Sequence, residues 1–294
     1  MIRLQGRNPE AGVVLINVLV ALALGSAIVV LMFTSQENLM DRTQRAAAAT
    51  QAEALALGAE ASLIAALRRD METAPDTDHM AEPWALAAQE EVQLETGTFA
   101  IAVTDAQARF DLNGLAAGRL LQQQILARLV TSLDLPDQVA LDIIDRVTRR
   151  GPMRSLSEVD TLDAQTRATL APHISLLPLL GDVNINTASE AVIAAVLGSP
   201  SAARQLVKRR EQSGFLTRGD VSDAGIVALN GIGFTSNVYD VESRAEVDGT
   251  TVTLTSRLIR ESLLGQKDTY AIERSFSAHI AGDGTLPDPE PFRP

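Results

Sequence analysis

Few side chains in this 294-residue chain have the types and spacing that catalysis or metal binding requires. The histidines, His79, His173 and His279, stand far apart in sequence, without the short spacing of a shared metal site. Asp142 and Asp145 lie one helical turn apart and could pair for acid–base chemistry or metal binding, although a solvated helix face is the commoner use of such spacing. The chain has no cysteine, Gly-rich phosphate loop or nucleophile motif. We therefore do not expect an enzyme.

The net charge limits the classes of partner that the chain can bind. Acidic residues outnumber basic ones by 37 to 25, which gives a formal net charge of -12. A chain of this charge repels nucleic acid and acidic lipid unless basic residues gather locally. Its length leaves room for an anchor and one or two further domains, which no disulfide can brace.

An uncharged apolar segment, residues 13-33, decides how the rest is interpreted. Only Asn17 and Ser26 interrupt it with strongly polar side chains. As a helix it would be about 30 Å long, the thickness of a bilayer's hydrocarbon core. Arg3 and Arg7 precede it, so the N-terminus is expected in the cytoplasm and the long C-terminal part outside. The segment predicts a single transmembrane helix with an exported C-terminal part, and the absence of cysteine fits a bacterial periplasm.

The residues at the entry to this helix resemble a processing site. The sequence from Gly12 to Leu19 is similar to the start of a type IV pilin or type II secretion pseudopilin. In that family a prepilin peptidase cuts after the glycine and methylates the new N-terminus. The resemblance thus implies that residues 1-12 are a leader, and that Gly12 and Val13 are the cleavage and methylation site.

Asn17 stands where most pilins have a glutamate. A carboxylate inside a bilayer is expensive and is normally kept for a partner, which in pilins is the amine of the neighbouring subunit. Three interpretations of Asn17 stay open. The chain is not a pilin, or it is a pilin-like subunit at the fibre tip with no neighbour above, or Asn17 only makes an interhelical hydrogen bond worth about 1 kcal/mol.

The segment after the anchor continues as helix, residues 34-70, which brings the whole helix to about 85 Å. Leu57, Ile64 and Leu67 share one apolar face with Ala61 between them, while Glu60 lies off it. Strand patterns then appear on both sides of a long helical region. Period-two alternation marks 92-103 and 238-258, with hairpin turns at Gly97 and Asp248-Gly249, and a last strand around 270-276 after a turn at 265-268.

The strands in each group are too few for a sheet of their own, but together they make one antiparallel sheet. The helical region between them has apolar faces over 119-133 and 136-149, and Thr187 and Glu190 have capping-box spacing before a helix that ends at Gly198. It also shows a short internal similarity, which predicts a duplicated unit: Met153, Ser155, Glu158 and Val159 align with Phe215, Thr217, Asp220 and Val221.

Two further blocks resemble the type II secretion minor pseudopilin K (GspK) family. They are the acidic-Pro-Trp block Asp78-His-Met-Ala-Glu-Pro-Trp84, and the strand end Thr104-Asp-Ala-Gln-Ala-Arg-Phe-Asp-Leu-Asn113. That family also lacks the glutamate of other pilins. The resemblance implies an α+β, pilin-like fold, in which a long transmembrane and stalk helix packs on a small antiparallel sheet and a large all-α domain is inserted between strands.

The expected organisation follows from these patterns: a leader at 1-12, the transmembrane helix at 13-33, the stalk at 34-70, pilin-like parts at 71-113 and 236-281, the inserted domain of SAM-like or helix-hairpin-helix type at 114-235, and a disordered tail at 282-294.

The resemblance also implies the function and the partners. The function is a minor pseudopilin that caps the periplasmic pseudopilus and helps to initiate it. The partners are the I- and J-type minor pseudopilins, the prepilin peptidase, the inner-membrane assembly platform and secreted cargo. Relatives bind calcium, but their acidic loop is replaced here by Arg146-Val-Thr-Arg-Arg-Gly151, and no ligands are assigned.

A membrane-anchored DNA receptor of the ComEA type is the alternative. The segments Asn184-Ile-Asn-Thr-Ala188 and Leu229-Asn-Gly-Ile-Gly-Phe234 resemble helix-hairpin-helix modules, whose Gly-Ile-Gly turns let backbone N–H groups approach a phosphate. Arg204, Lys208, Arg209 and Arg210 would supply a basic face. Acidic neighbours and Pro200 count against it, so no nucleic acid is expected.

Overall fold

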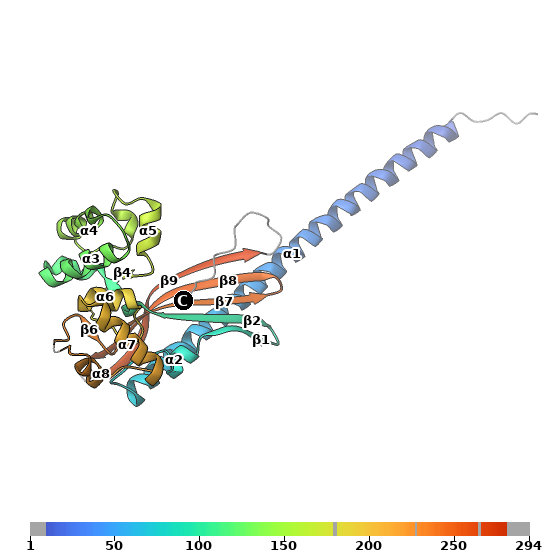
Figure 1. The fold of residues 1–294 in the computed structure, drawn as a ribbon. Helices are drawn as coiled ribbons and strands as arrows, with labels where there is room; N and C mark the ends of the chain where they lie inside the picture. Colours follow the sequence, from blue (N-terminus) through green and yellow to red (C-terminus); the bar gives the residue numbers. More distant parts are fainter. Residues whose placement is uncertain (1–9, 179–180, 227, 264–265, 281–294) are drawn as a thin grey trace, which may run out of the picture. The chain divides into compact units, whose positions relative to one another are not determined.

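The computed structural model describes residues 10–178, 181–226, 228–263 and 266–280. The chain divides into two compact units, residues 1–51 and 52–294. A single helix, α1 (Glu10–Thr73), runs from the first unit into the second (Figure 1). In the first unit α1 carries a segment long and apolar enough to cross a membrane, and the apolar window of that segment has no buried side chain. The predicted tail at 282-294 lies outside the described residues.

The second unit is built around an antiparallel five-stranded sheet. Its order is β1-β2-β7-β8-β9, so strands from both groups join in one sheet (Figure 1). The bounds are β1 (Gln89–Leu94), β2 (Gly97–Asp105), β7 (Val238–Val247), β8 (Thr250–Leu263) and β9 (Gln266–Ile280). The hairpin turns at Gly97 and Asp248-Gly249 are confirmed. The turn predicted at 265-268 falls partly outside the described residues, and β9 has already begun at Gln266.

One face of this sheet packs on the C-terminal part of α1. Leu63 and Leu67 of α1 are fully buried against a cluster from the sheet and from helix α2 (Pro83–Leu86): Trp84, Ile101, Val103, Tyr239, Val241 and Leu258. The buried stripe of α1 continues through Ala59, Ala56 and Ala52, whose small side chains let helix and sheet approach closely. Burying each leucine stabilises the fold by about 1.5–3 kcal/mol.

The face predicted for this helix was wrong in two details. Ala61 is exposed and Leu57 and Ile64 are only half-buried, because the stripe that meets the sheet is centred one residue earlier. Glu60, placed off the apolar face, is buried, and its carboxylate pairs with Arg274 of β9 at 2.7 Å. Glu60 can therefore be buried because Arg274, which is distant in sequence, neutralises its charge.

The chain between β2 and β7 forms a largely helical body, hereafter the insert, with its own core. This confirms the predicted fold class. The helices are α3 (Leu120–Ser132), α4 (Asp137–Arg150), α5 (Ala164–Leu170), α6 (Glu190–Leu197), α7 (Pro200–Ser213) and α8 (Arg218–Asp223), with 3-10 turns η1 (Ala106–Ala108), η2 (Leu112–Ala117) and η3 (Leu156–Glu158). The insert also contains two short parallel strand pairs, β3 (Phe110–Asp111) with β4 (Ile174–Ser175), and β5 (Val183–Asn184) with β6 (Ile232–Gly233).

The two halves of the insert repeat one pattern of local contacts. After β3, Asn113 exchanges two hydrogen bonds with the backbone of Met153, of 2.7 and 3.0 Å. After β5, Asn186 does the same with Leu216, at 2.7 and 3.2 Å. A capping box follows in each half, Ser155 with Glu158 and Thr217 with Asp220. These shared contacts favour a duplicated unit, but they make Met153 correspond to Leu216, whereas the alignment had predicted Phe215.

The capping box predicted at Thr187 was wrong. Ser189 is the N-cap of α6, and its hydroxyl accepts a hydrogen bond from the backbone N–H of Val192. Thr187 instead donates its hydroxyl proton to the buried carboxylate of Asp105, at 2.5 Å. The helix ends at Gly198, as predicted, with a left-handed backbone.

Candidate functional site

The predicted processing residues lie at the start of α1. Gly12 and Val13 belong to its first turns, and Asn17 follows one turn later. The side chain of Asn17 is exposed between the exposed Ile16 and Val18, and it makes no hydrogen bond among the described residues. A neutral amide therefore lies on an otherwise apolar helix surface. The roles of Gly12, Val13 and Asn17 stay predictions.

The histidines and aspartates considered for chemistry are not brought together. His79 stacks on Phe215 with ring centroids 4.7 Å apart, whereas His279 lies exposed on β9. Burial lowers the pKa of His173, next to β4. Asp142 accepts a hydrogen bond from Gln138, and Asp145 pairs with Arg149 one turn away. The two aspartates are therefore part of a solvated face of α4.

A buried polar network lies where the chain enters and leaves the insert, and we call it the junction. Asp105, the last residue of β2, is its centre. Its Oδ2 accepts hydrogen bonds from Asn184 (3.0 Å), Ser236 (2.6 Å) and Thr187 (2.5 Å), and its Oδ1 accepts one from the backbone N–H of Gln107 (2.8 Å). Burial raises the pKa of Asp105, while these donors favour the carboxylate.

Gln107 binds both ends of the insert together. Its Nε2 donates to the carbonyl of Asp182 at 2.9 Å, and its Oε1 accepts from the backbone N–H of Asn237 at 2.6 Å. Glycine at 181 leaves room for this amide, since a Cβ there would lie 2.5 Å from Nε2 of Gln107 and would displace it from its hydrogen bonds. This role could not be predicted, because an amide next to a turn carries no sign of a distant partner.

Asp78 connects the loop after α1 to the same junction. Its N–H donates to the carbonyl of Phe234 (2.8 Å), and its carbonyl accepts from Asn184 (3.0 Å). Its Oδ2 accepts from the backbone N–H of Ser236 (2.6 Å) and from the guanidinium of Arg260 in β8. The end of α1, the sheet and the insert are therefore joined through one aspartate.

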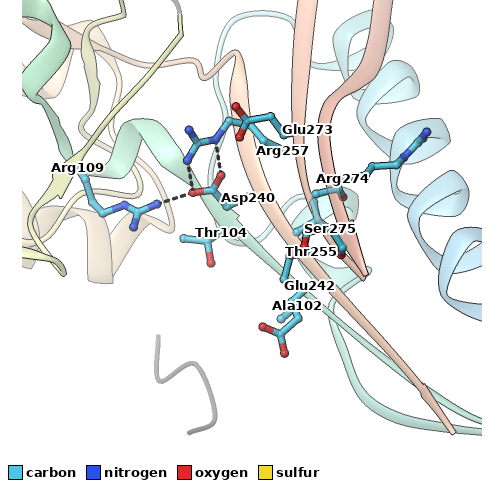
Figure 2. Close-up of a pocket in the computed structure, with 12 residues that line it drawn as sticks. Ala102, Thr104, Arg109, Asp240, Glu242, Thr255, Arg257, Glu273, Arg274 and Ser275 are labelled. Atoms are coloured by element: carbon cyan, nitrogen blue, oxygen red, sulfur yellow. Dashed lines mark hydrogen bonds and ion pairs between the residues drawn. The ribbon is translucent and has the colours of Figure 1, made fainter. Parts of the chain in front are cut away.

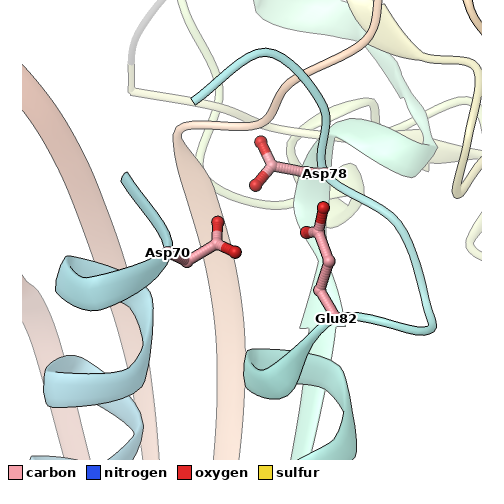
Figure 3. Close-up of side chains that lie close together, drawn as sticks. All are labelled: Asp70, Asp78 and Glu82. Atoms are coloured by element: carbon pink, nitrogen blue, oxygen red, sulfur yellow. The ribbon is translucent and has the colours of Figure 1, made fainter. Parts of the chain in front are cut away.

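Three carboxylates gather around Arg260, and we call Asp70, Asp78 and Glu82 the acidic cluster (Figure 3). Arg260 donates to Asp70 Oδ2 at 2.9 Å and lies over the ring of Tyr239. Glu82 Oε2 accepts from Trp84 Nε1 at 2.7 Å and from the backbone N–H of His79 at 3.1 Å. Burial and then the neighbouring carboxylates raise the pKa of Asp70 to about 7, and burial raises that of Glu82.

The sequence signal for this cluster was the acidic-Pro-Trp block itself. It contains Asp78, Glu82 and the buried Trp84, which packs edge-on against Tyr239 with centroids 5.0 Å apart. Arg260 was not singled out, although it follows Val252, Leu254 and Leu258 on the same face of its strand, where a charged residue breaks the apolar alternation.

A groove of about 540 Å³ lies at the sheet, lined in part by the face opposite α1 (Figure 2). At one end Asp240 accepts hydrogen bonds from Arg257 at 2.7 and 3.2 Å and from Arg109, at the start of the insert, at 2.8 Å. Arg257 also donates to the carbonyl of Leu176. These three charges satisfy one another and tie the insert to the sheet.

The features proposed for DNA binding have other uses. Arg209 pairs with Asp220 at 2.8 Å, and Arg210 turns inward to the carbonyls of Ile185 and Ala188. The Gly231-Ile-Gly233 segment pairs with β5, and the N–H of Ile232, which would face a phosphate in that motif, already donates to the carbonyl of Leu229 at 3.2 Å. A Cβ at Gly231 would contact core side chains of α3 and α6. This local structure does not favour the DNA-receptor interpretation.

The segment that replaces the relatives' acidic loop does not fit a calcium ion. Arg146 pairs with Glu158 and donates to the carbonyl of Gly151 at 3.1 Å. Arg149 pairs with Asp145 at 2.6 Å. Guanidinium groups thus stand where a cation would need oxygen ligands.

Comparisons with known proteins agree with this architecture. Residues 183–242 match the family described as type II secretion system (T2SS), protein K. A type II secretion system protein K of Pseudomonas aeruginosa is 26% identical over 255 residues, covering 73% of this chain and 76% of that protein. The Klebsiella pneumoniae protein of the same name is 27% identical over 251 residues, covering 70% and 77%.

A solved structure shows the same fold. It is the crystal structure of the GspK-GspI-GspJ complex from enterotoxigenic Escherichia coli, with a TM-score of 0.61 and 21% identity, covering 80% of this chain and 99% of the matched one. In sequence the chain is thus similar to type II secretion system K proteins over about three quarters of its length, and it shares the fold of the solved structure.

Proposed function

We propose that this protein is a minor pseudopilin that caps the tip of a type II secretion pseudopilus and helps to initiate its assembly. It is anchored by a single pass of α1 through the bacterial inner membrane, with the sheet and the insert in the periplasm. It has no catalytic role of its own. Export of proteins across the outer membrane then depends on it as an assembly component.

The position of the insert carries the proposal. The insert leaves the sheet after Asp105 and returns before Val238, at the sheet end where Asp70, near the C-terminus of α1, meets Arg260. The C-terminus of α1 is the end of the helix that lies farther in sequence from the apolar span. Pilin-like subunits stack along their N-terminal helices, so a body of this size at that end leaves no place for a subunit above.

Asn17 supports the same position. A carboxylate in the span would be expensive without a partner amine, and a tip subunit has no subunit above to supply one. The neutral amide avoids that cost.

The partners follow from the family. The Escherichia coli structure is of a complex of GspK with GspI and GspJ, and we propose that I- and J-type minor pseudopilins bind this chain through α1 and the sheet. A prepilin peptidase would cut between Gly12 and Val13. The inner-membrane assembly platform would extract the subunit, and the insert would face secreted cargo or the outer-membrane channel.

Labelling of isolated fibres tests the tip position. Because the chain has no cysteine, Asp160→Cys on the exposed surface of the insert gives a unique site for a biotin–gold label. We expect one label at one end of each pseudopilus. As a control, Glu53→Cys on the exposed side of α1 should react in the free protein and become protected in the fibre. Labels distributed along the fibre would contradict the tip position.

A further inference from the structure

The acidic cluster has unused ligand atoms. Asp70, Asp78 and Glu82 come from the end of α1, the following loop and the residue before α2, and their carboxyl groups turn toward one space (Figure 3). One oxygen of each lies within 4.8 Å of the others. The three residues are 2%, 0% and 5% exposed, so bulk water does not solvate them.

Arg260 supplies hydrogen bonds to only part of this cluster. Its guanidinium donates to Oδ2 of Asp70 and to Oδ2 of Asp78. Among the described residues, Oδ1 of both aspartates has no hydrogen-bond partner, and Oε1 of Glu82 has only His79 Nε2 nearby, at 3.3 Å. Buried acceptors without donors are rare in folded proteins and indicate a bound ion, proton or water.

The charges point in the same direction. When all three carboxylates are ionised, one guanidinium leaves an excess of two negative charges in a buried space. Uncompensated buried charge is strongly unfavourable. One divalent cation would balance it, and carboxylate oxygens are the ligands that Ca²⁺ and Mg²⁺ prefer.

We propose that the acidic cluster binds one oxygen-preferring divalent cation, Ca²⁺ or Mg²⁺, through the free oxygens of Asp70, Asp78 and Glu82. Arg260 keeps its two hydrogen bonds on the opposite side. This site is separate from the arginine-rich segment around Arg146.

The site would stabilise the attachment of the insert. Asp78 also holds Phe234, Asn184 and Ser236 through its backbone and Oδ2. A cation on Oδ1 would fix the loop that carries these contacts. The inference concerns the stability of the junction and does not depend on the proposed function.

Protons compete with the cation. Cation affinity should therefore fall at acid pH, where carboxyl groups become neutral. The charged and titratable groups around the cluster are Arg260, His79, Tyr239 and Asp105.

Terbium luminescence gives a direct test. Trp84 is the only tryptophan of the chain, and it donates to Glu82, so a Tb³⁺ ion in the cluster would be sensitised by it. With the full chain in detergent micelles at pH 8, after removal of metals, we expect tryptophan-sensitised Tb³⁺ emission that Ca²⁺ or Mg²⁺ displaces. The same cation should raise the thermal unfolding midpoint by roughly 5–10 °C at saturation.

Variants of the ligands and a control variant distinguish cation binding in the acidic cluster from a general effect of removing a buried charge. Glu82→Gln should weaken Tb³⁺ binding by more than about tenfold and abolish the cation-dependent stabilisation. Asp70→Asn serves as a second removal of a ligand if Glu82→Gln fails to fold. The matched control is Glu60→Gln, which changes another buried carboxylate of the same unit, paired with Arg274, and should keep both responses.

Two results would overturn the proposal. One is the absence of sensitised emission from the folded wild-type chain. The other is a midpoint that responds to acid alone and to no cation, because the cluster would then be neutralised by protons.

Discussion

Replacing Arg260 by methionine is expected to destabilise the second unit by about 3–5 kcal/mol, since it leaves buried carboxylates without their guanidinium. Arg260 is 5% exposed, and it binds both Asp70 and Asp78. Methionine fills much of the same volume, so the loss reports the charge more than the packing. Urea unfolding of the full chain in micelles, followed by the fluorescence of the buried Trp84, measures it.

The cost should depend on pH in a defined direction. The folded-state pKa of Asp70 is raised to about 7, so its contribution to stability is full below about pH 4 and is lost as pH rises through 7. Without Arg260 the carboxylates hold protons still more tightly. The variant should therefore lose more stability than the wild type between pH 5 and pH 8, measured with a chelator present.

Arg274→Met is the matched control for this prediction. Arg274 also reaches from the sheet to a buried carboxylate of α1, Glu60, but its own side chain is 46% exposed. A partly solvated pair contributes less, so we expect well under half the loss. Equal losses for the two variants would show that Arg260 is no more than an ordinary ion pair.

Asp105→Ala is expected to cost about 3–5 kcal/mol by leaving several buried donors unsatisfied. Asn184, Ser236 and Thr187 all donate to one carboxylate oxygen of Asp105. Because the core of the insert does not include these groups, the damage should be local to the junction. Hydrogen exchange should show lost protection at Gln107 and Asn237, with protection in α3 retained.

Asp240→Ala tests whether this effect belongs to the junction. Asp240 follows Tyr239, the residue of β7 that pairs with Asp105. Its side chain is 29% exposed and pairs with Arg109 and Arg257. We expect a loss of about 1–2 kcal/mol and unchanged exchange at Gln107. An Asp105→Ala protein that unfolds as one unit, without a local loss of protection, would contradict the junction's role.

The parts that the sequence predicted depend on short-range pattern. The apolar span contains enough uncharged residues for a bilayer, and Asp248-Gly249 sets the β7–β8 hairpin through backbone conformations that few residues adopt. The insertion of a helical domain between strands was predicted from the number of strands, because neither the strands before the insert nor those after it are enough for a stable sheet alone.

The junction could not be predicted, because its hydrogen bonds join residues far apart in the chain. Ser236 and Asp105 are 131 positions apart, and Asn184 and Asp105 are 79 apart. From the local sequence alone, Thr187 fits a helix cap and Glu60 fits a solvent-exposed face. In the structure Thr187 instead donates to Asp105, and Glu60 is buried against Arg274.

The central claim, that the chain is a processed pseudopilin, is tested most directly by its mature N-terminus. Intact mass and N-terminal sequencing would be measured on protein from membranes of strains with and without the prepilin peptidase. We predict that the peptidase removes residues 1–12 and leaves a methylated Val13, and that the strain lacking it keeps the full chain. An intact N-terminus in both strains would contradict the account.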